Sequence, residues 1–241
     1  MVSKKRDKNS LRVEQAYTKL KKAYIELKDS HAEMVFKLAL ISEMRDRSTG
    51  VHLVRIADYS ALIAEGLGLD QNEVEMIRMA SPMHDIGKVM LPDSILKKDG
   101  ALTKKEMGEV KKHPSVGSHI FAHAKTPMLK ACNVIALTHH EKYDGTGYPK
   151  GLKGEGIPLY GRIAALADCF DAYTSRRPYK KAFDFDLAVS MVKERVGTHF
   201  APAVVAAFLR QIDKIKMIWE ANKDIQAFLD EMEIEQEKML E

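Results

Sequence analysis

Two pairs of adjacent side chains in this sequence could bind metal ions. His84 is followed directly by Asp85, and His139 is followed by His140 and a glycine-rich segment, residues 141–149. Adjacent His and Asp side chains are costly to bury unless each finds a partner. Neutral imidazole and ionised carboxylate are both metal ligands, so an ion would satisfy them together. The two pairs therefore predict metal chemistry.

A larger set of potential ligands is spread along the chain. It consists of five His and two Asp and contains no thiolate: His52, His84, Asp85, His113, His139, His140 and Asp168. Nitrogen and oxygen donors without sulfur favour iron or manganese over a structural zinc. Seven ligands are more than one ion needs, and two ions sharing a carboxylate would use them all. Two ions a few Å apart can bind a phosphate and activate water, so the set predicts a two-metal phosphohydrolase.

The elements that must position these ligands are predicted to be nearly all helical. Helices are expected over residues 51–66, from Asp70 into His84, from Thr103, from His113, and over 127–140, 161–175, 183–196, 202–212 and 219–241. Asp70 with Glu73 and Thr103 with Glu106 have the spacing of capping boxes. Residues 143–158 hold five Gly and two Pro and predict a loop. A helical bundle can bring ligands from separate helices to one interior site, so the predicted fold class is all-α.

The N-terminal region predicts one long helix with a heptad seam. Apolar and aromatic residues recur there at alternating spacings of three and four: Tyr17, Leu20, Tyr24, Leu27, His31, Met34, Leu38 and Ile41. This spacing is typical of the a and d positions of a coiled coil. Two interpretations follow. Either the helix packs its seam against its own domain, or it forms a parallel coiled coil that dimerises the protein and joins it to an upstream sensor.

Composition limits the remaining classes. The 241 residues are 45% hydrophobic and carry a formal net charge of +4, so we expect a sizeable core and no nucleic-acid partner. Cys132 and Cys169 do not make a disulfide framework, no apolar run is long enough to span a membrane, and residues 1–10 lack the apolar core of a signal peptide. These observations favour the cytoplasm and no membrane association.

The order of the motifs resembles the HD-GYP domain, the branch of the HD phosphohydrolase superfamily that hydrolyses cyclic di-GMP. The resemblance covers roughly residues 35–215. It rests on residues 49–55, 84–88, 113–114 with Gly117, 139–149, 167–172 and 174–179. A lone His-Asp step is weak evidence, whereas this ordered set is specific. The implied fold is an HD-domain helical bundle that follows the long N-terminal helix.

The resemblance also implies a role for each matching residue. His52, His84, Asp85 and Asp168 would hold one divalent ion, and Asp85 would bridge to a second ion held by His113, His139 and His140. A hydroxide between the ions would attack the phosphorus atom. Asp85 and Lys88 are the predicted catalytic residues. Four side chains are predicted to contact substrate: Lys88, Tyr148, Arg177 and Lys180. The product would be linear pGpG, which would end a second-messenger signal.

One departure from the family pattern concerns the metal count. Many HD-GYP domains have Glu four residues before the His that matches His52, where it helps to hold a third metal. This chain has Ser48 at that position. A hydroxyl is a poor ligand for a hard divalent ion, so we expect two metals and slow or absent cleavage of pGpG to GMP.

Two alternatives remain open at this point. The same chemistry could act on another cyclic dinucleotide, such as cyclic GMP-AMP. Alternatively, the domain could turn substrate over poorly and serve as a cyclic-dinucleotide-binding or protein-interaction module. In either case the resemblance implies upstream sensor or receiver domains and GGDEF-type proteins as candidate partners.

The expected domain organisation has three parts. Residues 1–34 form the signalling and dimerisation helix, 35–215 the HD-GYP catalytic domain and 216–241 a C-terminal helical tail. Outside the ligand set, four His residues are expected to be structural or exposed: His31, His119, His123 and His199. Glu141 and Asp171 are candidates to support the ligating His rings, because such rings usually donate their second N–H group to an acceptor.

Overall fold

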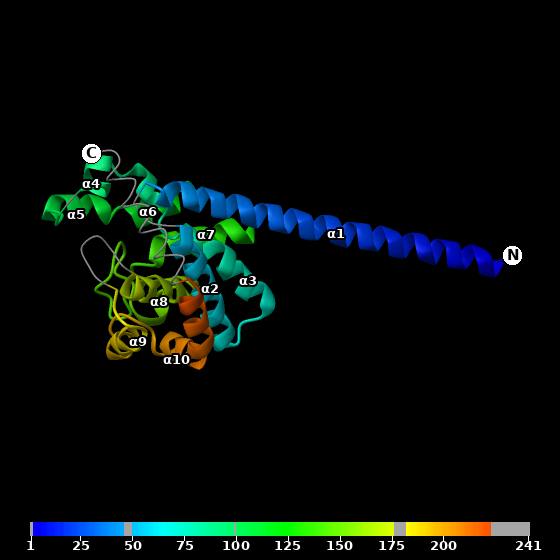
Figure 1. Cartoon of the computed structure of the whole chain (residues 1–241). Helices are drawn as coiled ribbons and strands as arrows, with labels where there is room; N and C mark the ends of the chain where they lie inside the picture. Colours follow the sequence, from blue (N-terminus) through cyan, green and yellow to red (C-terminus); the bar gives the residue numbers. More distant parts are fainter. Residues whose placement is uncertain (1, 46–49, 99, 176–181, 223–241) are drawn as a thin grey trace, which may run out of the picture.

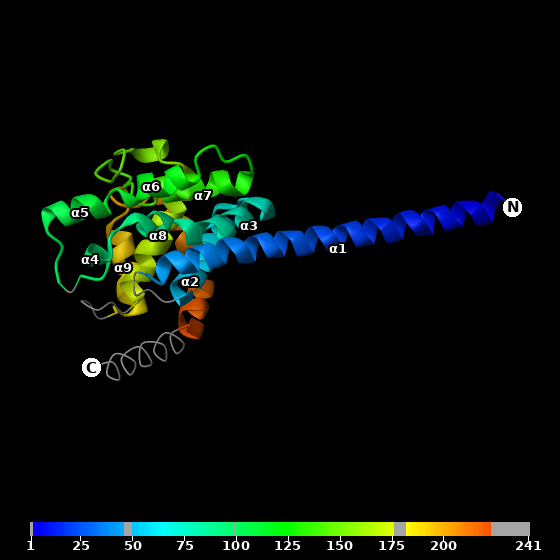
Figure 2. The same cartoon turned by 90° about the horizontal axis from the view of Figure 1, so that it is seen from above.

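The computed structural model describes residues 2–45, 50–98, 100–175 and 182–222, with side chains from residue 11 onward. Among these residues it contains helices, turns and loops and no named β-strand, which confirms the all-α prediction. The first helix, α1, spans Val2–Glu43. It projects away from a bundle made by the rest of the chain, and only its C-terminal part lies against that bundle (Figures 1 and 2). No described helix is both long and apolar enough to cross a bilayer.

The predicted seam of α1 is exposed rather than packed on the bundle. Tyr17 is 67% exposed, Leu20 69% and Leu27 56%, and the seam remains exposed as far as Ile41 at 61%. A different face of the helix packs on the bundle, through Val35, Phe36, Ala39 and Leu40. The interpretation in which the seam packs on its own domain is therefore wrong. A 42-residue helix of about 60 Å reaches well beyond a bundle of this size.

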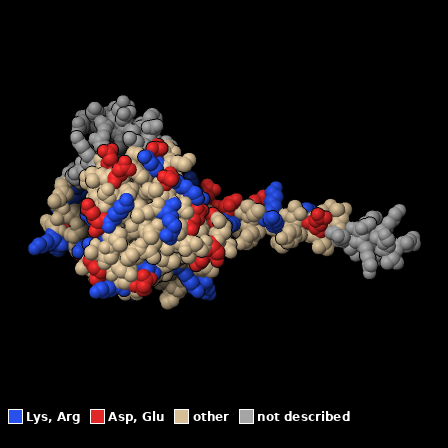
Figure 3. Space-filling model, turned by 90° about the horizontal axis from the view of Figure 1, so that it is seen from below, with Lys and Arg blue, Asp and Glu red and all other residues tan. Residues whose placement is uncertain are grey.

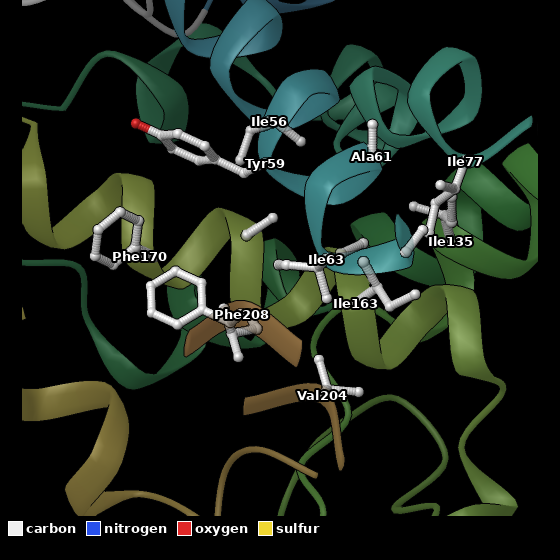
Figure 4. Close-up of a cluster of buried hydrophobic side chains, with 14 of the residues drawn as sticks. Ile56, Tyr59, Ala61, Ile63, Ile77, Ile135, Ile163, Phe170, Val204 and Phe208 are labelled. Carbon is white, nitrogen blue, oxygen red and sulfur yellow. The ribbon is translucent and has the colours of Figure 1, made fainter. Parts of the chain in front are cut away.

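Helix α2, Gly50–Leu67, is the central helix of the bundle. Its side chains Leu53, Ile56, Tyr59 and Ile63 are fully buried. In Figure 4, Ile56, Tyr59 and Ile63 lie among side chains of α3 (Gln71–Ala80), α7 (Pro127–Thr138), α8 (Leu159–Thr174) and α10 (Pro202–Arg210). The ring of Tyr59 packs edge-on against Phe170 at 5.6 Å between centroids. Burying such side chains stabilises the fold by about 1.5–3 kcal/mol each.

The segment that contains His84 and Asp85 differs from its prediction. The sequence predicts one helix from Asp70 into His84, but α3 ends at Ala80. A 3-10 turn, η1 (Ser81–Met83), precedes His84, and a second, η2 (Ile86–Met90), follows Asp85. Pro82 lies in the first turn, and its missing N–H group and its ring prevent an α-helix from continuing through it. The Asp70 cap is confirmed, because its carboxylate accepts from the backbone N–H groups of Asn72 and Glu73.

Most of the remaining described elements agree with their predictions within a few residues. These are α5 (Lys104–Val110), α6 (His113–Ile120) and α9 (Phe185–Glu194), with a 3-10 turn η3 (Gly154–Gly156) inside the predicted loop. The short helix α4 (Asp93–Leu96) was not predicted. Thr103 and Glu106 form the predicted capping box at the start of α5. Residues 212–222 are helical, and the rest of the predicted C-terminal tail lies outside the described residues.

Charged side chains are mixed on the face of the bundle shown in Figure 3, where Lys and Arg alternate with Asp and Glu. Among the described residues, several oppositely charged side chains form pairs, such as Arg78 with Asp58 at 2.5 Å and Lys214 with Glu65 at 3.4 Å. Exposed pairs of this kind contribute little to stability.

Candidate metal centre

Five structural elements bring the predicted ligands together. His52 comes from α2, His84 and Asp85 from the link between η1 and η2, His113 from the first residue of α6, and Asp168 from α8. His139 and His140 follow the last residue of α7. All seven fall into two groups. Within each group, the donor atoms lie within 4.8 Å of one another. One group is His52, His84 and Asp168, and the other is Asp85, His113, His139 and His140.

The carboxylate of Asp85 lies between the two groups. Its Oδ1 atom is 3.0 Å from Nε2 of His113 and 3.5 Å from Nε2 of His139. Its Oδ2 atom is 3.3 Å from Nε2 of His84, which belongs to the first group. One carboxylate therefore presents one oxygen to each group, which is the arrangement that a bridging ligand requires.

Most of the imidazole rings are oriented by a hydrogen bond at Nδ1. His84 donates to the carbonyl oxygen of Ser81 at 3.0 Å, His113 to Val110 at 2.7 Å, and His139 to Ile135 and Ala136 at 3.1 Å each. Donation from Nδ1 fixes the tautomer and leaves the Nε2 lone pair for another partner. These acceptors are backbone groups three or four residues earlier, so the helix ends themselves orient the rings.

His52 uses a side chain for the same purpose. Its Nδ1 lies 2.6 Å from Oδ2 of Asp171, whose carboxylate is 1% exposed. Asp171 also accepts hydrogen bonds from Arg55 and from the hydroxyl of Ser175 at 3.2 Å. Burial raises the pKa of Asp171, but His52 and Arg55 outweigh this effect and hold it far below its ordinary value. The supporting role predicted for Asp171 agrees with this geometry, whereas Arg55 lies in the motif at residues 49–55 but had no predicted role.

The electrostatics of the site favour a cation between the carboxylates. Burial lowers the pKa of His84, but Asp85 and Asp168 outweigh it and raise the pKa to about 9. Burial lowers the pKa of His139 and lowers that of His140 further, so both rings favour the neutral form that binds metals. Nε2 of His84 is buried without a hydrogen-bond partner. The donor set and this unpartnered atom fit a bound divalent ion.

A close backbone contact keeps His113 near Asp85 within the second group. A Cβ atom at Gly87 would come within 2.0 Å of the carbonyl oxygen of His113. Glycine is therefore required where η2 crosses the start of α6. A larger residue would push His113 away from Asp85, which is two residues before Gly87.

The glycine-rich loop packs against the residues that follow α7. Glu141 is 2% exposed, and its carboxylate accepts from the backbone N–H groups of Lys150 at 2.8 Å and Leu152 at 3.0 Å. A Cβ atom at Gly147 would lie 2.3 Å from the nitrogen of Lys142, so this glycine serves close packing, while Gly145 adopts a φ of +88°. The loop is thereby folded back on the end of α7.

Tyr148 lies at the edge of the metal centre. Its ring stacks on His140 with 4.7 Å between centroids and 29° between planes, and Nζ of Lys111 is 5.3 Å from its centroid. Burial raises the pKa of Tyr148, and Asp85 and Asp168 add to the effect, so its hydroxyl stays a hydrogen-bond donor. Lys88, the other predicted substrate contact in the described part of the chain, places Nζ 2.8 Å from Oδ2 of Asp85. Arg177, Lys180 and Ser48 lie outside the described residues.

The comparisons with known proteins agree with this geometry. A family model described as HD domain matches residues 29–204, which is most of the chain. The chain belongs to the HD domain family.

HD-domain structures resemble it in fold. A cyclic GMP-AMP specific phosphodiesterase of Vibrio cholerae has a TM-score of 0.59 at 20% identity, over 76% of this chain and 48% of that one. The PgpH HD domain of L. monocytogenes with cyclic di-AMP has a TM-score of 0.52 at 15% identity, over 79% and 96%.

Curated relatives are closer in sequence. A cyclic di-GMP phosphodiesterase response regulator of Xanthomonas campestris is 43% identical over 80% of this chain and 51% of the relative. A cyclic di-GMP phosphodiesterase of Thermotoga maritima is 41% identical, over 83% and 55%. A 3'3'-cGAMP-specific phosphodiesterase of Vibrio cholerae is 40% identical, over 79% and 36%. These relatives confirm the HD-GYP resemblance of this HD domain. The chain spans about half the length of the first two and about a third of the third.

Proposed function

We propose that this HD domain is a metal-dependent phosphodiesterase that hydrolyses cyclic di-GMP to linear pGpG. The observation that supports it most directly is the position of Asp85, with one carboxylate oxygen toward each of two groups of ligands. The similarity to cyclic di-GMP phosphodiesterases at 41–43% identity supports the substrate.

The proposed cofactors are two divalent ions, iron or manganese. One would be held by His52, His84 and Asp168 and the other by His113, His139 and His140, with Asp85 shared. Such ions supply charge to a phosphate and an activated water near neutral pH. Ser48 offers no carboxylate for a third ion, so we propose that the reaction stops largely at pGpG.

The protein's own groups would bind and orient the phosphodiester. Lys88 carries a positive charge beside Asp85, where it can stabilise negative charge that develops on a phosphate oxygen. The protonated hydroxyl of Tyr148 is a donor at the edge of the same centre. Arg177 and Lys180 are proposed to contact the phosphates as well, since guanidinium and ammonium groups recognise them.

The test is hydrolysis of cyclic di-GMP by protein loaded anaerobically with iron or with manganese, followed by chromatography and by metal analysis per chain. We expect two metals, pGpG as product, and loss of both metal and turnover in Asp85→Ala. Retained hydrolysis in that variant would contradict the shared-carboxylate mechanism. Two bound metals without turnover of any cyclic dinucleotide would instead indicate a binding module.

A second substrate is supported by the relatives. The 3'3'-cGAMP-specific phosphodiesterase is 40% identical to this chain, nearly as similar as the enzymes named for cyclic di-GMP. Overall identity therefore does not separate the two substrates. Rates on cyclic di-GMP and on 3'3'-cGAMP, measured side by side on one metal-loaded preparation, would decide between them.

We also propose a homodimer through α1, in the cytoplasm. The exposed seam at Tyr17, Leu20 and Leu27 is apolar surface that a second copy of the helix would cover. Cys132 and Cys169 are both free thiols, which suits a reducing compartment. Sensor or receiver domains and GGDEF-type proteins remain proposed partners, with residues 1–34 as the helix that would link to them, 35–215 as the catalytic domain and 216–241 as a tail.

A further inference from the structure

Glu43, the last residue of α1, is a buried carboxylate without an adequate partner. It is 3% exposed, and its Oε1 atom is buried with no hydrogen-bond partner. Burying an ionised carboxylate is costly unless an opposite charge compensates it. Buried polar atoms that lack a partner are rare in folded proteins, and an unseen ion or water is a common explanation.

The end of α1 lies directly against the segment that contains His84 and Asp85. The hydroxyl of Ser42 donates to the carbonyl oxygen of Ile86 at 3.5 Å. Arg45 donates to the carbonyl oxygens of Val89 and Leu91, the second at 3.1 Å. These contacts place Glu43, between Ser42 and Arg45, beside the segment that contains His84 and Asp85.

The described cationic side chains in this region pair with carboxylates other than Glu43. Lys88 pairs with Asp85, Arg45 pairs with Asp93 at 2.7 Å, and Arg55 binds Asp171. Within the described part of the chain, a side-chain cation therefore does not account for the charge of Glu43. The first metal group, His52, His84 and Asp168, is the neighbouring place where a positive charge is expected.

We propose that Glu43 supports the metal ion of this first group, with its carboxylate reaching the ion through a bound water molecule. We assign a contact through water because Glu43 is not a member of the first group, whose donor atoms lie within 4.8 Å of one another. The proposal rests on the metal centre described under the proposed function. Outer carboxylates of this kind change metal affinity by about 10- to 100-fold.

The substitution Glu43→Gln tests the proposal, because it keeps the size of the side chain and removes its charge. Two effects of opposite sign are expected in the full chain. The melting temperature of the metal-free protein should stay the same or rise, because an uncompensated buried charge is gone. The affinity for Mn²⁺ at one of the two sites, measured by calorimetric titration, should fall about tenfold or more.

The control is Glu33→Gln, which removes an exposed charge from the same helix and should change neither quantity. A Glu43→Gln protein that binds Mn²⁺ like the unaltered chain would overturn the proposal. So would a variant whose metal-free form is strongly destabilised while its Mn²⁺ affinity is kept, because that result indicates a purely structural carboxylate. If the unaltered chain binds no Mn²⁺ or Fe²⁺ at all, the proposed metal centre fails as well.

Discussion

Nδ1 of His52 lies 2.6 Å from Oδ2 of Asp171, although the two residues are 119 positions apart in the chain. The hydrogen bond joins α2 to α8 inside the bundle and turns the other ring nitrogen of His52 toward His84 and Asp168. Asp171 is itself held by Arg55, so ring orientation depends on a chain of three buried side chains.

Asp171→Asn should therefore weaken the first metal site. The amide retains the shape of the carboxylate but loses the charge that fixes the His52 tautomer, so we expect Mn²⁺ affinity at one site to fall about 10- to 100-fold. Calorimetric titration measures the change, and Asp186→Asn, at an exposed position on α9, is the matched control. Unchanged binding by Asp171→Asn would show that the His52 ring is oriented without this hydrogen bond.

The ring and the hydroxyl of Tyr148 should have separable effects. Tyr148→Ala removes the stack on His140 and should lower kcat/KM for cyclic di-GMP by about tenfold or more. Tyr148→Phe keeps the stack and should lose less than Tyr148→Ala. Steady-state kinetics with metal content measured on each variant checks this, and equal losses in both variants would assign the whole effect to the hydroxyl.

His199 should make stability depend on pH. Burial, with the nearby charges of Lys142 and Arg195, lowers its pKa to about 4 from the ordinary value of 6.5. The folded state thus favours the neutral ring, so this contribution to stability is present above pH 6.5 and is lost as the pH falls toward 4.

The measurement is urea unfolding at pH 7 and pH 4.5. Between these values the unaltered protein should lose about 1–2 kcal/mol more unfolding free energy than His199→Gln, after allowance for the partial exposure of the ring. His119→Gln, at an exposed position, should behave like the unaltered chain. If all three proteins showed the same pH dependence of the unfolding free energy, His199 would not be its cause.

The seam of α1 should control the oligomeric state. Leu20→Glu combined with Leu27→Glu places charge on an exposed apolar face that does not touch the bundle. We expect the dimer to dissociate to monomers in sedimentation experiments, with the melting temperature of the bundle nearly unchanged. Lys19→Glu with Lys22→Glu, at exposed positions off the seam, should remain dimeric. A monomeric unaltered chain at micromolar concentration would contradict the proposed dimer.

Some features follow from the sequence because their interactions are local. The capping box of Thr103 and Glu106 joins residues three apart, and the structure contains it. The seven candidate ligands were named by residue type and motif order, and the structure gathers all of them. A long helix with an apolar seam over residues 17–41 was also visible as spacing, since side chains three and four apart share one face of a helix.

Other features were decided only by packing between distant segments. The tertiary structure places Asp85 between the two ligand groups, connects Asp171 to His52, and brings the end of α1, with Glu43, against the segment that contains Asp85. It also selects Val35, Phe36 and Ala39, rather than the seam, as the face of α1 that packs on the bundle. Sequence spacing specifies which side chains share an element, but the distance between elements depends on how the whole core is filled.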